Sequence, residues 1–247
     1  MKDYEAHTYG DRIAGVYDDT YETLFDVDAT VTFLAELAGN GSALELAIGT
    51  GRIALPLAGR GVEVTGIDAS QAMVAELRAK PGGDDIPVAM GDFADVDVEG
   101  RFKLVFVVFN TLFALTTQDD QVRCFTNVAE HLAEDGVFVV EAFVPDATRF
   151  TRYQTFGVDN LDSDSVRLEA SRHDPVNQTV DSQHIVLRRG EPVEMYPVSI
   201  RYTYPSELDL MARLAGLRLR GRWGGWHKEP FTSESKFHVS VYERARP

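Results

Sequence analysis

The chain has 247 residues, enough for one large α/β domain or two small ones. Its formal net charge of −15 repels nucleic acid and anionic membranes, and no run of lysines and arginines offsets it. The single cysteine, Cys124, excludes an intramolecular disulfide, and the longest apolar run, 104–109, is too short to span a bilayer. We expect a cytoplasmic protein, monomeric or homodimeric, that binds neither nucleic acid nor membrane.

Up to Pro145 the sequence alternates between two patterns. Some segments repeat apolar residues at helical spacing, and others are short apolar runs typical of buried strands. Thr117 is placed to cap the last of these helices. The expected helices and strands, in chain order, are helix 28–38, strand 43–48, helix 52–61, strand 62–68, helix 70–80, strand 86–92, strand 103–110, helix 117–136 and strand 136–143. This alternation predicts a Rossmann-like, doubly wound parallel sheet.

The pattern changes after Pro145. Three alternating segments, 166–173, 179–188 and 195–204, are joined by turn-rich stretches, which predicts an antiparallel sheet inserted into the chain. A helix capped at Ser206 then precedes the two last strands, 217–223 and 236–243. We expect a single domain, 1–247, whose seven-stranded main sheet ends in an antiparallel strand.

The stretch GTGRIA follows the first expected strand. Glycines at 49 and 51 permit a tight turn and a close approach of a ligand to the backbone. An isolated G-x-G is equally typical of an ordinary strand-to-helix turn. Here Asp68 ends the next strand, where a carboxylate can accept both hydroxyls of a ribose. The combination favours a nucleoside site.

Three details favour a nucleoside other than NAD. Glu45 lies inside the first strand, where a carboxylate favours an ammonium or sulfonium over a pyrophosphate. Asp92 ends the third strand and can accept a hydrogen bond from an adenine amino group. The last two strands are joined by a long connection without a helical pattern, compatible with an antiparallel hairpin that closes the sheet.

These motifs together resemble the class I S-adenosylmethionine (SAM)-dependent methyltransferases over roughly residues 10–145. The run 45–51 resembles their motif I, with alanine in place of its first glycine, and GIDAS and GDF resemble their second motif and adenine-contacting turn. The resemblance implies SAM as cofactor. The six histidines are scattered and form no metal-spaced cluster with cysteine or aspartate, so we expect no metal. The resemblance also implies that the cofactor contacts Glu45, Ala47, Gly49, Gly51, Asp68, Ala69, Met73, Asp92, Phe93 and Asn110.

The N-terminal region, 1–40, resembles the lid that precedes motif I in bacterial small-molecule methyltransferases. Tyr9, Arg12 and Tyr17 are then further cofactor contacts, with Arg12 able to pair with the methionine carboxylate. A loosely packed helix with surface tyrosines is the alternative interpretation of the same residues. The inserted segment, 148–204, is expected to cover an acceptor pocket.

The layout is similar to that of actinobacterial enzymes that methylate amino sugars or peptide amino termini. The segment FNTLFALTTQ, 109–118, would border the acceptor pocket and contains no histidine or carboxylate, which favours an amine acceptor of a small natural product. Tyr17, His184 and His227 are candidates for a catalytic role. An O-methyltransferase, an NAD-dependent oxidoreductase and a non-catalytic SAM-binding regulator remain the alternatives.

Overall fold

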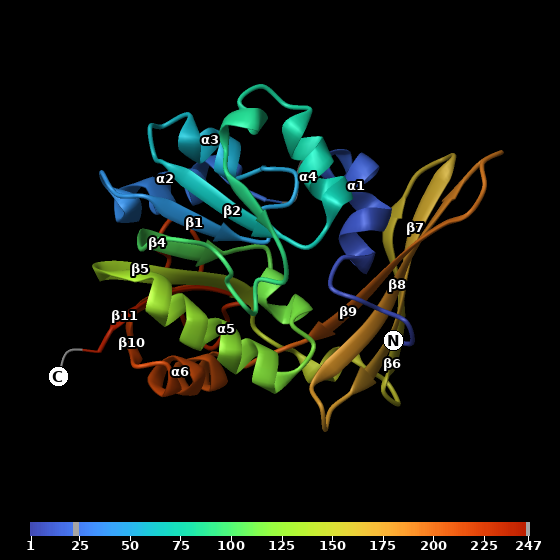
Figure 1. The fold of residues 1–247 in the computed structure, drawn as a ribbon. Helices are drawn as coiled ribbons and strands as arrows, with labels where there is room; N and C mark the ends of the chain where they lie inside the picture. The colour runs from blue at the N-terminus through green and yellow to red at the C-terminus, as the bar shows by residue number, and fades with distance from the viewer. Residues whose placement is uncertain (22–24, 246–247) are drawn as a thin grey trace.

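The computed structural model describes residues 1–21 and 25–245, which form two β-sheets (Figure 1). The main sheet has seven strands in the order β10-β11-β5-β4-β1-β2-β3. Strands β1 to β5 are parallel to one another, β11 is antiparallel to β5, and β10 is antiparallel to β11. The strands are β1 Ala43–Leu46, β2 Val64–Asp68, β3 Val88–Met90, β4 Phe102–Val107, β5 Leu132–Phe143, β10 Leu217–Trp223 and β11 Phe237–Arg244. The predicted fold class is confirmed.

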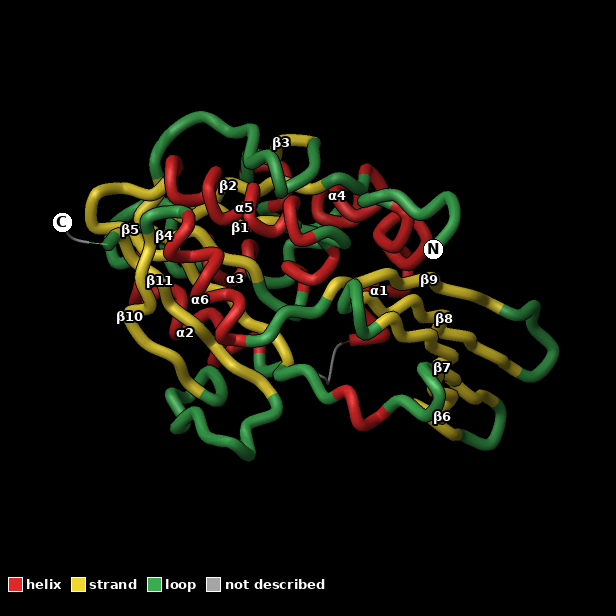
Figure 2. Tube along the Cα trace, turned by 90° about the horizontal axis from the view of Figure 1, so that it is seen from below, coloured by secondary structure: helices red, strands yellow, loops and turns green. Residues whose placement is uncertain are grey.

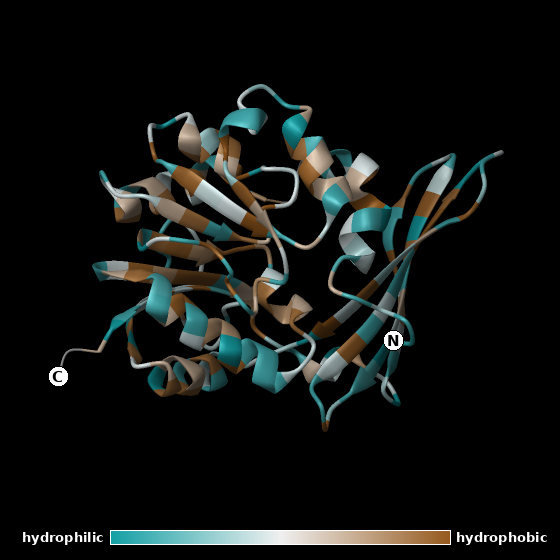
Figure 3. Cartoon of the chain, viewed as in Figure 1, coloured by the Kyte–Doolittle hydropathy of each residue, from teal (hydrophilic) through white to brown (hydrophobic). Residues whose placement is uncertain are grey.

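Helices cover both faces of this sheet. Apolar residues of α2, α3 and α4 pack on one face, and those of α5 and α6 pack on the other. These helices are α2 Val27–Ala38, α3 Ala54–Ala58, α4 Gln71–Arg78, α5 Gln118–His131 and α6 Pro205–Leu214. In β4, Leu104 and Val105 point into opposite layers, and both are fully buried. Figure 3 shows the resulting concentration of hydrophobic residues along the strands. The core is therefore two apolar layers divided by the sheet.

Side-chain caps fix several helix starts. Thr117 accepts a hydrogen bond from Asp120 N–H at the start of α5, as predicted, and Ser70 does the same for Met73 at the start of α4. The prediction for α6 was wrong. Its cap is Tyr204, without a side-chain hydrogen bond, because Pro205 already supplies a helical φ at the first position.

The second sheet is inserted between β5 and α6. It is antiparallel, in the order β6-β7-β8-β9. Its strands are β6 Gln154–Leu161, β7 Ser165–Asp174, β8 Thr179–Arg188 and β9 Glu194–Arg201. The sequence predicted three of them and missed β6, because β6 is an exposed edge strand with no buried face to impose alternation.

Helix α1, Thr8–Tyr21, lies between the two sheets. Its buried Ile13 and Ala14 pack against Met73 of α4, and Tyr196 of β9 packs on the same cluster. Figure 2 shows α1 beside the second sheet. Residues 22–24 of the expected lid lie outside the described residues. Among the described helices, none combines the length and apolar character needed to cross a bilayer.

Candidate functional site

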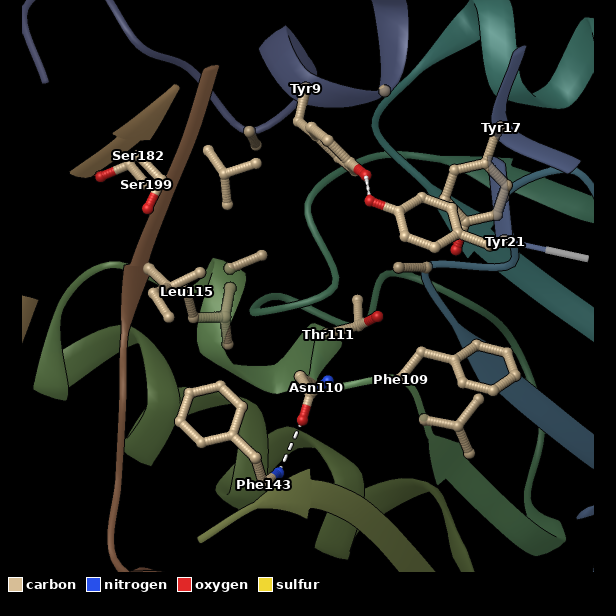
Figure 4. Close-up of a pocket in the computed structure, with 18 of the residues that line it drawn as sticks. Tyr9, Tyr17, Tyr21, Phe109, Asn110, Thr111, Leu115, Phe143, Ser182 and Ser199 are labelled. Atoms are coloured by element: carbon tan, nitrogen blue, oxygen red, sulfur yellow. Dashed lines mark hydrogen bonds between the residues drawn. The ribbon is translucent and has the colours of Figure 1, made fainter. Parts of the chain in front are cut away.

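A cavity of about 450 Å³ opens where the parallel strands end. Carboxyl ends of β1, β2 and β4 form one side of it, α1 covers it, and the inner face of the second sheet forms its far wall. Ligands of doubly wound sheets bind at this edge, and the volume suits a small molecule. Figure 4 shows Ser182 and Ser199 of the second sheet across the cavity from Tyr17 and Tyr21 of α1.

The turn after β1 has three residues with left-handed φ: Ala47 at 57°, Gly49 at 56° and Gly51 at 76°. A Cβ on Gly49 would meet no atom within 4 Å, so the backbone of Gly49 faces open space and is accessible to a ligand. A Cβ on Gly51 would lie 2.3 Å from Leu77 Cδ1, so glycine allows the turn to pack against α4. Ala47 adopts the conformation that glycine prefers, at the strain cost of a side chain.

Glu45 is a buried carboxylate in the wall of this cavity, only 4% exposed. Ala54 N–H donates to it, whereas Oε2 has no hydrogen-bond partner among the described residues. Burial, and then the neighbouring charge of Asp68, raise the pKa of Glu45 well above its ordinary value. A buried carboxylate oxygen without a donor is costly, so this position fits a positively charged ligand group.

Asp68 ties β2 to the glycine turn. Its Oδ2 accepts from Gly49 N–H at 2.7 Å, and its Oδ1 accepts from Ser70 N–H at 2.8 Å. Burial raises the pKa of Asp68, and these backbone donors oppose that shift. Each carboxylate oxygen keeps a lone pair that a ligand hydroxyl can use. Nearby, the predicted Ala69 and Met73 also line the cavity.

The ends of β3 and β4 complete the sheet side. Asp92 and Phe93 follow β3 and line the cavity, with Asp92 Oδ1 accepting from Ala94 N–H at 2.9 Å. After β4, Phe109 and Asn110 have left-handed φ values of 57° and 63°. Two such residues in succession are strained, and the neighbouring strand β5 holds them.

The support for that turn comes from Glu141 and Phe143. Phe109 N–H donates to the Glu141 carboxylate, and Asn110 N–H donates to the Glu141 carbonyl at 3.3 Å. Asn110 Oδ1 accepts from Phe143 N–H at 2.6 Å, as Figure 4 shows. Burial raises the pKa of Glu141 to about 7. Glu141 itself does not line the cavity, and sequence reasoning missed it.

Helix α1 brings tyrosines over the crevice. The hydroxyls of Tyr9 and Tyr21 lie 2.8 Å apart, and the ring centroids of Tyr17 and Tyr21 lie 4.9 Å apart (Figure 4). Burial raises the pKa of Tyr17, so its phenol stays protonated at neutral pH and is a poor general base. The guanidinium of Arg52 lies 5.0 Å from the centroid of the Tyr17 ring and donates to the Tyr21 carbonyl at 2.8 Å.

An ion-pair network fastens α1 to the glycine turn. Asp18 accepts from Thr50 Oγ1 at 2.7 Å and pairs with Lys80 Nζ at 2.5 Å. Lys80 Nζ also donates to the Thr50 carbonyl at 2.7 Å. In the first turn of α1, Asp11 accepts from Ser70 Oγ at 2.6 Å. These contacts cross from α1 to the residues that border the crevice.

Two predicted residues lie away from the cavity. Arg12 is exposed on α1 and is not part of the lining, whereas Arg52, which sequence reasoning missed, is. The position of Arg52 directly after Gly51 was the sequence feature that could have indicated it. His227 Nε2 lies 3.2 Å from Asp26 Oδ2, and the loop that carries it packs through Trp226 against Phe33 of α2.

His184 does line the cavity, at its second-sheet end. Cross-strand pairing places it opposite Glu169, and Ser182 lies opposite Ser171. Asp159, Glu169 and His184 each offer one atom that could ligate a metal, and these three atoms lie within 4.8 Å of one another. The cavity therefore extends from the strand ends of the main sheet to polar side chains of the second sheet.

Comparisons with known proteins agree with this geometry. A family model described as a methyltransferase domain matches residues 43–136. The cypemycin N-terminal methyltransferase of a Streptomyces species is 30% identical over 207 residues, covering 81% of this chain and 82% of that protein. The dTDP-4-amino-2,3,4,6-tetradeoxy-D-glucose N,N-dimethyltransferase of Saccharopolyspora spinosa is 33% identical over 101 residues, 40% of this chain and 39% of that protein.

Among solved structures, the CcbJ methyltransferase from Streptomyces caelestis is 40% identical, with a TM-score of 0.89, covering 98% of this chain and 100% of that chain. The predicted resemblance is confirmed, and the oxidoreductase alternative is set aside. The bare Gly49 backbone and the unpartnered Glu45 Oε2 fit a cofactor that carries a positive charge. The chain belongs to the SAM-dependent methyltransferases.

Proposed function

We propose that this enzyme transfers the methyl group to an amine of a small natural product or its precursor. The main support for this proposal is the composition of the cavity wall after β4. The lining residues there, Thr111, Ala114 and Leu115, include no acid or histidine. A hydroxyl acceptor usually needs a base beside it, whereas an amine has only to arrive neutral. The names of two relatives, one acting on a peptide terminus and one on an amino sugar, support an amine.

When bound, SAM supplies an electrophilic methyl group on a sulfonium. In our assignment, Glu45 faces the methionine ammonium, Asp68 accepts from the ribose hydroxyls, and Arg52 is better placed than Arg12 for the methionine carboxylate. Further contacts in the proposal are Tyr9, Tyr17, Ala47, Gly49, Gly51, Ala69, Met73, Asp92, Phe93 and Asn110. The protein mainly aligns the acceptor and excludes water.

We also propose that α1 is the lid of the cofactor crevice and that the second sheet covers the acceptor. The contacts of Asp18 with Thr50 and Lys80 support a closed position of α1 over the glycine turn. The position of Val198 and Ile200 in the cavity wall supports β9 as an acceptor-facing surface. In this arrangement the two sheets exclude water from the reacting atoms.

The test is incubation with SAM that carries an isotope-labelled methyl group, followed by mass spectrometry. Matched pools of amines and of phenols with the same carbon skeletons serve as acceptors. We expect label on nitrogen in the amine pool, with a rate that rises with pH as the amine loses its proton. A variant with Asp68→Ala, which loses the anchor of the glycine turn, is the inactive control. Label on oxygen alone would refute the amine assignment.

A further inference from the structure

One part of the cavity wall is built on β7 and β8 of the second sheet. Glu169 and His184 lie opposite each other on these strands, next to the pair Ser171 and Ser182. Arg149, from the short helix η3 Ala147–Arg149, reaches the same place. The lining of a single cavity includes both this part and the crevice at the sheet edge, so a ligand at the crevice can extend to it.

Glu169 is fixed by one of its two carboxylate oxygens. Oε1 accepts from Arg149 Nη2 at 3.0 Å, from Ser182 Oγ at 3.2 Å, and from Ser171 Oγ. Among the described residues no donor reaches Oε2 within hydrogen-bond distance. The side chain is 21% exposed, in the cavity wall. An oriented carboxylate with one free oxygen is a ready acceptor for a ligand hydroxyl or ammonium.

The charged residues that line the whole cavity also favour a ligand that brings hydrogen-bond donors or a positive charge. Its described lining has five carboxylates and two guanidiniums, and both guanidiniums already have partners. Arg149 pairs with Glu169, and Arg52 donates to the carbonyls of Tyr17 and Tyr21. The carboxylates are Glu45, Asp68, Asp92, Asp146 and Glu169. Beside Glu169, a phosphate or diphosphate would meet a guanidinium, Arg149, that is already paired with a carboxylate.

The apolar part of the same wall limits the acceptor further. Val180, Val198 and Ile200 lie beside Glu169 and His184 in the cavity lining. A molecule that fits must therefore present both hydrocarbon surface and hydrogen-bond donors to the second sheet. A sugar carried on a nucleoside diphosphate would instead present two anionic phosphates.

We propose that Glu169 Oε2 binds hydroxyl or ammonium donors of an acceptor that carries no phosphate. This inference rests on the proposed N-methylation and narrows its acceptor to a free amine-bearing compound. It separates this enzyme from the relative named for a dTDP-linked amino sugar. Glu169 is a specificity residue here, on β7 of the second sheet and not on the strands of the main sheet, and the reacting nitrogen does not depend on its charge.

The experiment compares three acceptor arms with labelled SAM, in EDTA so that no metal ion bridges Asp159, Glu169 and His184. The arms are free hydroxylated amino sugars, peptides with a free amino terminus, and the same amino sugars linked to thymidine diphosphate. We expect product in one of the first two arms and none in the third.

Substitution of Glu169 then tests its role. Loss of a charge-assisted hydrogen bond in Glu169→Gln should raise the acceptor KM about tenfold, with kcat, the KM for SAM and the affinity for S-adenosylhomocysteine (SAH) nearly unchanged. Glu194→Gln is the matched control, because it removes a carboxylate of the same sheet outside the cavity lining. The unchanged SAH affinity also shows that the variant is folded.

The outcomes separate the two proposals. Methylation of the nucleotide-linked sugar on nitrogen would overturn the phosphate-free acceptor and leave N-methylation intact. Methylation of a free acceptor on oxygen would overturn N-methylation and leave the role of Glu169 intact. An unchanged acceptor KM in Glu169→Gln, or no product from either free-amine arm, would overturn the inference about Glu169.

Discussion

Glu141 makes the stability of this fold depend on pH in a direction that can be measured. The side chain is 5% exposed, and burial raises its pKa from 4.5 to about 7 against the opposing effect of the Phe109 and Asn110 N–H groups. The folded protein keeps this proton up to about pH 7, whereas the unfolded chain loses it near 4.5. Stability from this group is therefore present below pH 4.5 and is lost as pH rises to 7.

The size of the effect follows from the shift. A rise in pKa from 4.5 to about 7 corresponds to roughly 3 kcal/mol of folding free energy, of which about 2 kcal/mol is lost between pH 5.5 and 8.5. Glutamine at position 141 keeps the shape and one acceptor oxygen for Phe109 N–H but does not titrate. Relative to wild type, Glu141→Gln should gain about 2 kcal/mol over this pH interval.

Urea unfolding of both proteins at several pH values measures this difference directly. Other buried carboxylates, including Glu45, titrate equally in both proteins and cancel. Glu63→Gln removes one exposed negative charge and corrects for the general effect of charge. A difference between Glu141→Gln and wild type that stays constant from pH 5.5 to 8.5 would refute the reasoning.

Three further substitutions test the crevice. Asp18→Asn removes the ion pair with Lys80. Because Asp18 is 43% exposed, we expect the dissociation of SAH, measured by stopped flow, to be only roughly threefold faster. An unchanged rate would argue against α1 as a lid. Ala47→Gly relieves a left-handed φ of 57° and should raise the free energy of unfolding by about 0.5 kcal/mol, whereas a loss would show that the alanine methyl packs usefully. Gly51→Ala places a Cβ 2.3 Å from Leu77 Cδ1 at a φ of 76° and should cost about 3 kcal/mol in urea unfolding; wild-type stability would mean that Leu77 moves freely.

The parts of the fold that sequence could predict are those with strong local patterns. β4 is apolar on both faces because it lies between two helical layers, and Thr117 caps α5 through its own side chain. The motif-I turn could be predicted for a similar reason, because Gly49 and Gly51 follow β1 closely in sequence and Asp68 ends β2.

The parts that sequence could not predict depend on tertiary convergence. Glu169 and Arg149 meet only because η3 folds back onto β7, and nothing local marks either residue. Glu141 sits in an apolar strand, and its partner Phe109 lies on the neighbouring strand end. Arg52 was passed over in favour of Arg12 because the direction in which α1 presents its side chains is set by packing on α4, not by its own pattern.

The most direct test of the central claim is a crystal structure of the protein soaked with SAH. We predict density along the turn at residues 47–51, with the amino group at Glu45 Oε2, the ribose at Asp68, and the adenine between Met73 and Phe93. Density for the compound at another surface, or a crevice that stays empty at saturating SAH, would contradict it.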